Sequence, residues 1–302
     1  MPSKHNFVTL DVFTSSAFGG NQLAVFPDAS GIPEDALLRI AREFNFAEVT
    51  FCYPPAEAAH TKRVRIFTPA REIPFAGHPT VGTAIALVML GQAGAQTGAE
   101  LKLVLEEGVG PIPVTVRLKA GAPAFAQFST ARLAETGPAT PSAGAISEVL
   151  MIDPDDILLT PLAPQNVTCG LPFLMVPLRS VDAVSRSRVR IEKWEQILKS
   201  AWAPDIFVFA KDGDTHYHAR MYGPGVNVPE DPATGSANAC LAGYLGARAE
   251  QQDGTLVWTV DQGVEMGRPS RLEIEADKSA GKVTAIRVGG NAVMMTEGSL
   301  SI

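Results

Sequence analysis

The feature that most constrains the fold of this chain is an internal repeat at an offset of 155 residues. Residues 65–91, RIFTPAREIPFAGHPTVGTAIALVMLG, align without a gap with residues 220–246, RMYGPGVNVPEDPATGSANACLAGYLG. Six of the 27 aligned positions are identical, where average residue usage would give roughly two. At a nearby offset, residues 19–27 resemble residues 169–177. Several matches in the same order predict two similar lobes that arose by duplication.

The periodicity of apolar residues predicts a mixed α+β fold in which sheet dominates. Alternation with a period of two, rich in Val, Ile, Phe and Tyr, predicts strands, and wider apolar spacing predicts helices. The predicted strands cover residues 7–13, 62–67, 101–105, 113–118, 207–210, 216–222, 256–260 and 271–276, and the predicted helices cover residues 33–44, 79–90, 191–201 and 233–250. Residues 119–145, rich in Ala, Gly, Pro, Ser and Thr, are expected to connect the lobes and to include a loop;.

Composition excludes several classes of partner. The net charge of -7 and the isoelectric point near 5.3 argue against nucleic acid and against an anionic membrane surface;. The longest apolar run, residues 84–90, is too short to span a bilayer, and the first residues lack the apolar core of a signal peptide;. The cytoplasm is therefore the expected location. Cys52, Cys169 and Cys240 have no CxxC spacing and are expected to be buried thiols;.

The repeat suggests how a site is built. Two helices that begin with small residues at matching places can direct their N-termini at one cleft, where unpaired N–H groups favour a carboxylate. Gly77, Gly82 and Gly235 would let the backbone approach a ligand closely;. The alternative is that these small residues serve only helix packing.

Three polar residues accompany the two helix starts. His78 stands in AGHPT, and Asp231 and Ser236 stand in EDPATGS. Beside a helix N-terminus, an imidazole is disfavoured as a cation and works as a neutral hydrogen-bonding group. Alternatively, Asp231 only caps its helix and His78 is a structural imidazole.

Glu48 is the candidate general base. It lies in FNFAEVTFCY, where a predicted helix has ended and an apolar strand begins. Strand alternation could direct it to solvent or into the cleft. If it faces the cleft, its apolar neighbours would raise its pKa toward neutrality, as a group that both takes and returns a proton requires.

Two histidines could in principle form part of a metal site, but the sequence gives little support for one. His216 and His218 alternate on one predicted strand, but no third ligand follows from the sequence nearby;. We therefore expect structural or surface roles for both and no metal site.

Six motifs, in order across nearly the whole chain, resemble the PhzF family of phenazine-biosynthesis-like isomerases, which shares the diaminopimelate epimerase fold. They are DVFTSSAFGGNQLAVF, FNFAEVTF, RIFTPAREIPFAGHPTVGTA, EDPATGSANACLAGYL, QGVEMGRPSRL and VGGNAVMM. The resemblance implies two pseudo-symmetric lobes, each a sheet wrapped around a central helix, with the active site in the cleft between them. It also implies that the final strand completes the first lobe. The expected lobes are residues 1–122 with about 286–302, and residues 123–285.

The same resemblance implies roles for individual residues. Glu48 matches the family's proton shuttle, and His78 and Asp231 match residues that assist around the substrate. The segments GGN and ATGS resemble carboxylate-binding loops. The implied substrate-binding residues are Gly20, Asn21, Gly77, Thr80, Thr234, Gly235 and Ser236. The family works without a metal or an organic cofactor, acts on small carboxylates and commonly forms homodimers.

This sequence departs from the motifs of its relatives at two places, and both bear on the reaction that is expected. Related epimerases and racemases place one cysteine at each helix start, but here those places hold Ala76–His78 and Asp231–Ala233. A two-thiol racemase is therefore not expected. The residue before the glutamate, often serine in phenazine-producing members, is Ala47, so the substrate need not be the same.

The leading hypothesis is a cofactor-independent isomerase in which Glu48 moves a proton between two carbons of a small carboxylate. The shift of a double bond in trans-2,3-dihydro-3-hydroxyanthranilate is the family's example. Two alternatives remain open: a racemase or epimerase that uses Glu48 and Asp231, and a catalytically idle binding or scaffold protein of the same fold.

Overall fold

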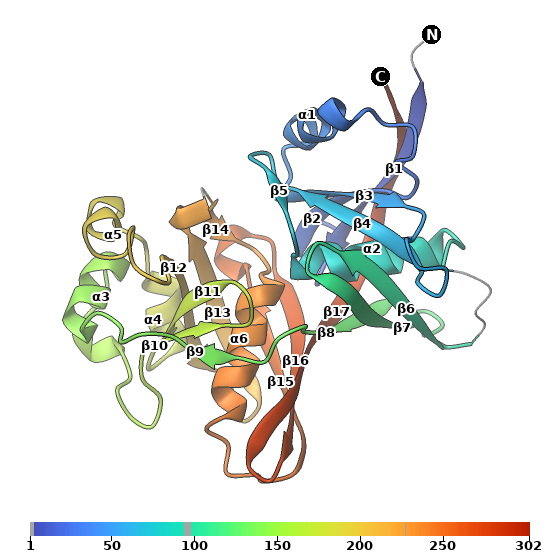
Figure 1. Ribbon diagram of the computed structural model, residues 1–302. Helices are drawn as coiled ribbons and strands as arrows, with labels where there is room; N and C mark the ends of the chain where they lie inside the picture. The colour runs from blue at the N-terminus through green and yellow to red at the C-terminus, as the bar shows by residue number, and fades with distance from the viewer. Residues whose placement is uncertain (1–2, 94–97, 227) are drawn as a thin grey trace. The chain divides into compact units, whose positions relative to one another are not determined.

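The computed structural model describes residues 3–93, 98–226 and 228–302 (Figure 1). The chain divides into two compact units, one formed by residues 1–131 with 288–302 and the other by residues 132–287. The expected boundaries, 122/123 and 285/286, differ from these. Strand β8 (Phe125–Ser129) pairs with β7 (Gly110–Arg117), which keeps it in the first unit.

The first unit is a sheet with two helices. Strand β2 runs parallel to β3, while β1 pairs antiparallel with both β2 and β17. Residues 292–301 of β17 pair with β1, so the last strand does complete the first unit. Besides β7 and β8, its elements are β1 (Lys4–Val12), β2 (Asn21–Phe26), α1 (Glu34–Phe44), β3 (Glu48–Tyr53), β4 (Lys62–Phe67), β5 (Glu72–Ile73), α2 (Gly77–Met89), β6 (Glu100–Glu107) and the end of β17 (Lys282–Ser301).

The second unit combines a sheet with four helices and three short 3₁₀ turns. Its strands are β9 (Glu135–Thr136), β10 (Gln165–Thr168), β11 (Pro172–Pro177), β12 (Asp205–Lys211), β13 (His216–Gly223), β14 (Val228–Asp231), β15 (Gly254–Gln262) and β16 (Ser270–Ser279). Its helices are α3 (Ala143–Leu150), α4 (Val181–Arg186), α5 (Ile191–Ile197) and α6 (Gly235–Gly246), and the 3₁₀ turns are Pro154–Asp156, Pro224–Val226 and Val264–Met266.

The two units share one strand topology. In the first, β2–β3 and β4–β6 are parallel pairs, and β3–β4, β4–β5 and β6–β7 are antiparallel. In the second, β11–β12 and β13–β15 are parallel, and β12–β13, β13–β14 and β15–β16 are antiparallel. The duplication predicted from the sequence is therefore confirmed.

A repeated ion pair reflects the same duplication. Arg65 on β4 makes a two-pronged contact with Glu72 on β5, with both N–O distances at 2.7 Å. Arg220 on β13 holds Glu230 on β14 in the same way, at 2.7 and 2.8 Å. These arginines are aligned identities of the sequence repeat, whereas their glutamate partners stand at different positions of the two copies.

Each unit buries one small-residue helix. In α2 every residue from Gly77 to Leu87 is buried, and α6 is buried along most of its length. A Cβ at Gly82 would lie 2.5 Å from Leu23 and 2.7 Å from Val12. Since real Cβ atoms do not approach so closely, Gly82 serves the packing of α2 against β1 and β2.

The secondary-structure prediction missed several elements. Helices α3 and α4 are short and were not expected, and α6 ends at Gly246, before the predicted end at residue 250. Residues 119–145 contain β8, β9 and the start of α3; β8 pairs with the preceding β7 and with the distant β17, and β9 pairs with β10. Among the described residues, no helix combines the length and apolar character needed to cross a membrane.

Candidate functional site

Glu48 and His78 lie together in the first unit. Glu48 is the first residue of β3, and His78 is the second residue of α2. His78 Nε2 lies 3.3 Å from Glu48 Oε2, and the side chains are 5% and 16% exposed respectively. The predicted base therefore faces the predicted supporting histidine and keeps limited access to solvent.

Asn21 completes this group. Its Nδ2 lies 3.3 Å from His78 Nδ1, and both side chains are buried. Asn21 is placed by β2, which begins at this residue and pairs with Val12 of β1. Gly20 makes the turn before it, with a φ of +62° and with Val12 O only 2.2 Å from where a Cβ would stand. A side chain at Gly20 would displace the turn.

His78 is neutral at physiological pH. Burial lowers the pKa of His78 to about 3, although a backbone hydrogen bond with Gln22 acts in the opposite direction. Because the amide nitrogen of Asn21 can only donate, its contact favours the tautomer with Nδ1 as acceptor.

Thr80, which was predicted to contact the substrate, has its side chain inside the first unit. It is fully buried, and its Oγ1 lies 2.7 Å from Ala76 O and 2.8 Å from Glu107 Oε1. Its hydroxyl is thus engaged inside the unit. Gly77 is buried at the first position of α2, directly before His78.

The other predicted residues belong to the second unit. Asp231 ends β14, and Thr234 is the N-cap of α6, ahead of Gly235 and Ser236. Thr234 Oγ1 donates to Asp231 Oδ2 at 2.5 Å. This bond joins Asp231 to the N-cap residue, but Asp231 does not itself cap α6 as the alternative raised from the sequence supposed. Gly235 is buried, and Ser236 is partly exposed.

Gln262 is a supporting residue that was not singled out from the sequence. It is fully buried at the end of β15, and its Nε2 donates to Asp231 O at 2.8 Å and to Thr234 Oγ1 at 3.0 Å. Its Oε1 accepts from Asn238 at 2.9 Å and from the Thr234 backbone at 3.3 Å. Gln262 stands in the motif QGVEMGRPSRL, which was noticed only as part of a resemblance.

The next residue, Gly263, is the first glycine of that motif, and the backbone around it requires a glycine. Its φ is +73°, and a Cβ there would lie 2.6 Å from Pro232 O. Only glycine lets the two segments approach so closely.

Glu107 was also missed. It ends β6 and is buried, and burial raises its pKa to about 8. The signal was present in LKLVLEE, where alternation places Glu107 on the same face as Leu101, Leu103 and Leu105;.

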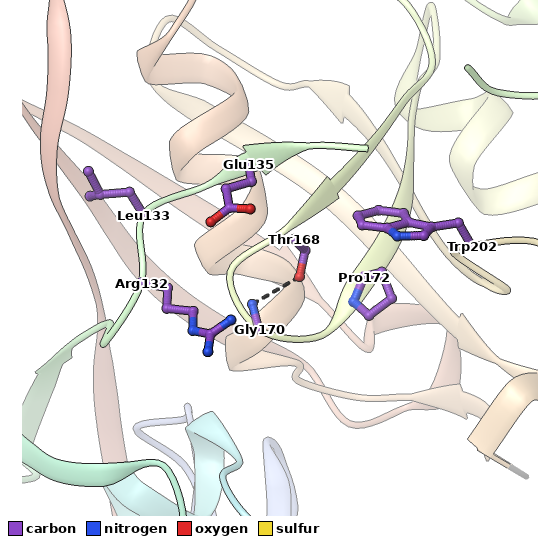
Figure 2. A pocket seen from close by; sticks show the side chains of 7 residues that line it. All are labelled: Arg132, Leu133, Glu135, Thr168, Gly170, Pro172 and Trp202. Atoms are coloured by element: carbon purple, nitrogen blue, oxygen red, sulfur yellow. Dashed lines mark hydrogen bonds between the residues drawn. The ribbon is translucent and has the colours of Figure 1, made fainter. Parts of the chain in front are cut away.

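A separate pocket of about 240 Å³ lies within the second unit (Figure 2). None of the predicted site residues is among those that line it. It is smaller than a typical small-molecule site, and its lining mixes Arg132 and Glu135 with the indole of Trp202. The remaining lining residues are Leu133, Thr168, Gly170 and Pro172.

The described residues also bear on metal and thiol chemistry. Within residues 3–93, 98–226 and 228–302, no cluster of three or more His, Cys, Asp or Glu side chains could hold a metal ion. His216 instead contacts Thr259 and Asp261, and His218 contacts Glu265.

Cys52 and Cys240 are buried free thiols, and Cys169 is partly exposed. Burial raises the pKa of Cys52 to about 12, so this thiol is inert;.

The family model described as "Phenazine biosynthesis-like protein" matches residues 10–298 of the chain. A protein of Mesorhizobium japonicum described as an uncharacterized isomerase is 40% identical, over 98% of this chain and 99% of its own length. The trans-2,3-dihydro-3-hydroxyanthranilate isomerase of Pseudomonas fluorescens is 34% identical over the same shares of the two chains.

Solved structures show the same similarity. A PhzF-family protein of Bacillus anthracis superposes with a TM-score of 0.86 at 24% identity, over 99% of this chain and 100% of its own. A Pseudomonas aeruginosa protein described as a predicted epimerase has a TM-score of 0.77 at 30% identity, over 98% and 99%. A hydroxyproline epimerase from Agrobacterium vitis, at 12% identity and a TM-score of 0.68 over 99% and 91%, shares the fold. The epimerase-like fold class expected from the sequence is confirmed.

Proposed function

From the premise that this chain belongs to the phenazine biosynthesis-like (PhzF) family and is an isomerase, we propose that it catalyses a proton shift in a small unsaturated carboxylate, with Glu48 as the proton shuttle. The observation that carries the proposal is the pair formed by the Glu48 carboxylate and the buried, neutral His78, whose facing atoms are 3.3 Å apart. The 34% identity to an isomerase of trans-2,3-dihydro-3-hydroxyanthranilate supports the reaction class.

The chemistry follows from the protonation states. Glu48 takes a proton from an activated carbon, becomes neutral, and returns the proton to another carbon of the same conjugated system. One C–H bond breaks and another C–H bond forms, so no bond or proton is gained or lost overall. The double bond changes its position within the conjugated system. The neutral imidazole of His78 lies beside the carboxylate, with Nε2 3.3 Å from Glu48 Oε2, and its bulk limits the positions open to the flexible Glu48 side chain.

The backbone supplies the environment for a carboxylate. The first N–H groups of α2 and α6 have no carbonyl partner within their own helix and carry partial positive charge. Gly77 and Gly235 open these two starts, and we propose that Asn21, Gly20 and Ser236 assist in holding the substrate. Asp231 is proposed to assist the proton transfer. The small carboxylate, a homodimer and a cytoplasmic location stay predictions.

Glu48→Gln tests the assignment. A glutamine keeps the size and hydrogen bonding of the side chain but cannot accept the proton, so we expect the turnover rate to fall at least about a hundredfold. Trans-2,3-dihydro-3-hydroxyanthranilate and a panel of unsaturated and hydroxylated carboxylates would be incubated in deuterated water and followed by NMR. Glu43→Gln, on the exposed end of α1, is the matched control and should behave as wild type.

Two outcomes would change the proposal. Deuterium incorporation as fast in Glu48→Gln as in wild type would show that another group is the base. Exchange at a stereocentre with loss of optical activity and no moved double bond would favour epimerisation, the second candidate. That candidate draws its support from the 30% identical structure described as a predicted epimerase.

A further inference from the structure

A buried carboxyl group lies behind the start of α2. Glu107 is 7% exposed at the end of β6, and its Oε2 has no hydrogen-bond partner among the residues that the structure describes. Its Oε1 lies 2.8 Å from Thr80 Oγ1. An ionised carboxylate in this place would carry a buried charge satisfied by one hydroxyl, which is energetically costly.

The hydrogen-bond geometry indicates where the proton resides. Thr80 Oγ1 lies 2.7 Å from Ala76 O and 2.8 Å from Glu107 Oε1. The threonine hydroxyl has only one proton, and a carbonyl oxygen can only accept. If Thr80 donates to Ala76 O, its bond with Glu107 requires a proton on the carboxyl group. The resulting series of hydrogen bonds runs from Glu107 through Thr80 to Ala76.

We propose that Glu107 is a positioning residue that carries a proton in the folded enzyme and, by donating to Thr80, fixes the first turn of α2. Ala76 is the N-cap of α2 and has no side-chain cap of its own, and its carbonyl accepts from both the backbone N–H and the hydroxyl of Thr80. The turn from Ala76 to Thr80 contains His78. The effect of Glu107 on catalysis rests on the proposed role of His78 beside Glu48.

The backbone supports the same connection. Glu107 and Gly110 are paired residues at the β6–β7 hairpin. At Gly108, in the turn, a Cβ would lie 2.7 Å from Pro74 Cα. The hairpin therefore packs directly against the segment that leads into α2, and this packing helps to fix the position of Glu107.

The surroundings of Glu107 keep its proton in place. On α2 the group that contacts it is the Thr80 hydroxyl, and on β3 the titratable group that interacts with it is Cys52. Burial raises the pKa of both Cys52 and Glu107, to about 12 and about 8, so that both are neutral at neutral pH. The adjacent Glu106 differs, since backbone bonds from Ala56 and Glu57 and a bond with His60 hold its pKa at about 2.

Infrared spectroscopy tests the protonation directly. At about pH 6.5 we expect wild type to show the carbonyl stretch of a protonated carboxylic acid, and we expect this band to disappear as the pH is raised through about 8. The part of the band that is lost through about pH 8 should be absent from Glu107→Gln and present in the matched control Glu106→Gln, whereas any contribution from Asp205, whose pKa burial raises to about 6, is lost at lower pH. Identical spectra for wild type and Glu107→Gln at pH 6.5 would overturn the proposal.

Steady-state kinetics test the positioning role. Glu107→Ala removes the donor, and we expect kcat to fall roughly tenfold, the effect of one lost hydrogen bond, with KM changed less than about twofold. Glu107→Gln keeps an N–H donor toward Thr80 and should restore kcat to within about threefold of wild type. Equal impairment of the alanine and glutamine variants would contradict the role of a neutral donor.

The two proposals can fail separately. If Glu48→Gln stays active, the roles of Glu48 and His78 fail while the infrared band still reports on Glu107. If the band is missing but Glu48→Gln is inactive, only the inference about Glu107 fails. Should Glu107→Ala not fold, the infrared comparison of the two glutamine variants still decides.

Discussion

At the scale of single residues, burial sets the protonation state of the candidate site. His78 is buried with its pKa lowered to about 3, whereas an unfolded chain would have a histidine near 6.5;. Between these values the unfolded state binds more protons than the folded state. The stability contributed by a neutral His78 is therefore present above about pH 6.5 and is lost as the pH falls toward 3.

This linkage predicts the behaviour of His78→Asn. On going from about pH 7.5 to about pH 5, wild type should lose about 2 kcal/mol of unfolding free energy relative to the variant, which has no imidazole to protonate. Urea unfolding of both proteins at the two pH values measures the difference. A constant difference between them would mean that the folded state protonates His78 as easily as the unfolded state does.

At the scale of secondary-structure elements, the start of α6 depends on one side chain from another strand. Gln262 on β15 donates to Asp231 and Thr234 and accepts from Asn238. All three partners lie between the end of β14 and the second turn of α6. The loop that bears Asp231 is therefore held by β15 as well as by its own residues.

Gln262→Glu should weaken this connection. A carboxylate cannot donate, so Asp231 O and Thr234 Oγ1 lose their bonds within a fully buried site, and we expect a loss of about 1–3 kcal/mol in unfolding free energy. Denaturant unfolding at neutral pH measures it. The exposed Gln251→Glu is the control and should stay within about 0.5 kcal/mol of wild type;. A Gln262→Glu protein as stable as the control would show that these bonds do not hold the loop.

At the scale of the whole molecule, duplication gave the two units the same contact in different surroundings. The Arg65 side chain is 23% exposed, and its partners Glu34 and Glu72 are 75% and 43% exposed. Arg220 is 3% exposed, and besides Glu230 it donates to the backbone carbonyls of Ser185 and Ser187. The second copy is thus part of a core, and the first is close to the surface.

The two copies should respond differently to the same substitution. Arg220→Met leaves the Glu230 carboxylate without its buried cation, and we expect a loss of about 3–5 kcal/mol. Arg65→Met removes a solvent-screened ion pair, and we expect a loss of about 1 kcal/mol or less. Thermal and denaturant unfolding of the two variants provide the comparison. Equal losses would indicate that burial does not distinguish the two contacts.

The sequence by itself determined the duplicated α+β architecture, the two small-residue helices and the motifs in which Glu48, His78 and Asp231 stand. These features are local, because alternation, helix starts and identities at a fixed offset can all be read along the chain. The short helices α3 and α4 and the strands β8 and β9 were missed because such short elements are stabilised by tertiary packing and strand pairing more than by their own residue pattern.

Tertiary structure alone decided which side chains meet. Only the fold brings Glu48 of β3 to His78 of α2, turns Thr80 inward to Glu107, and places Gln262 beneath Asp231. Alternation could place Glu107 on the buried face of β6, but it could not reveal the threonine that faces it. Burial and hydrogen-bond partners set a protonation state, and both arise from contacts between residues distant in the chain.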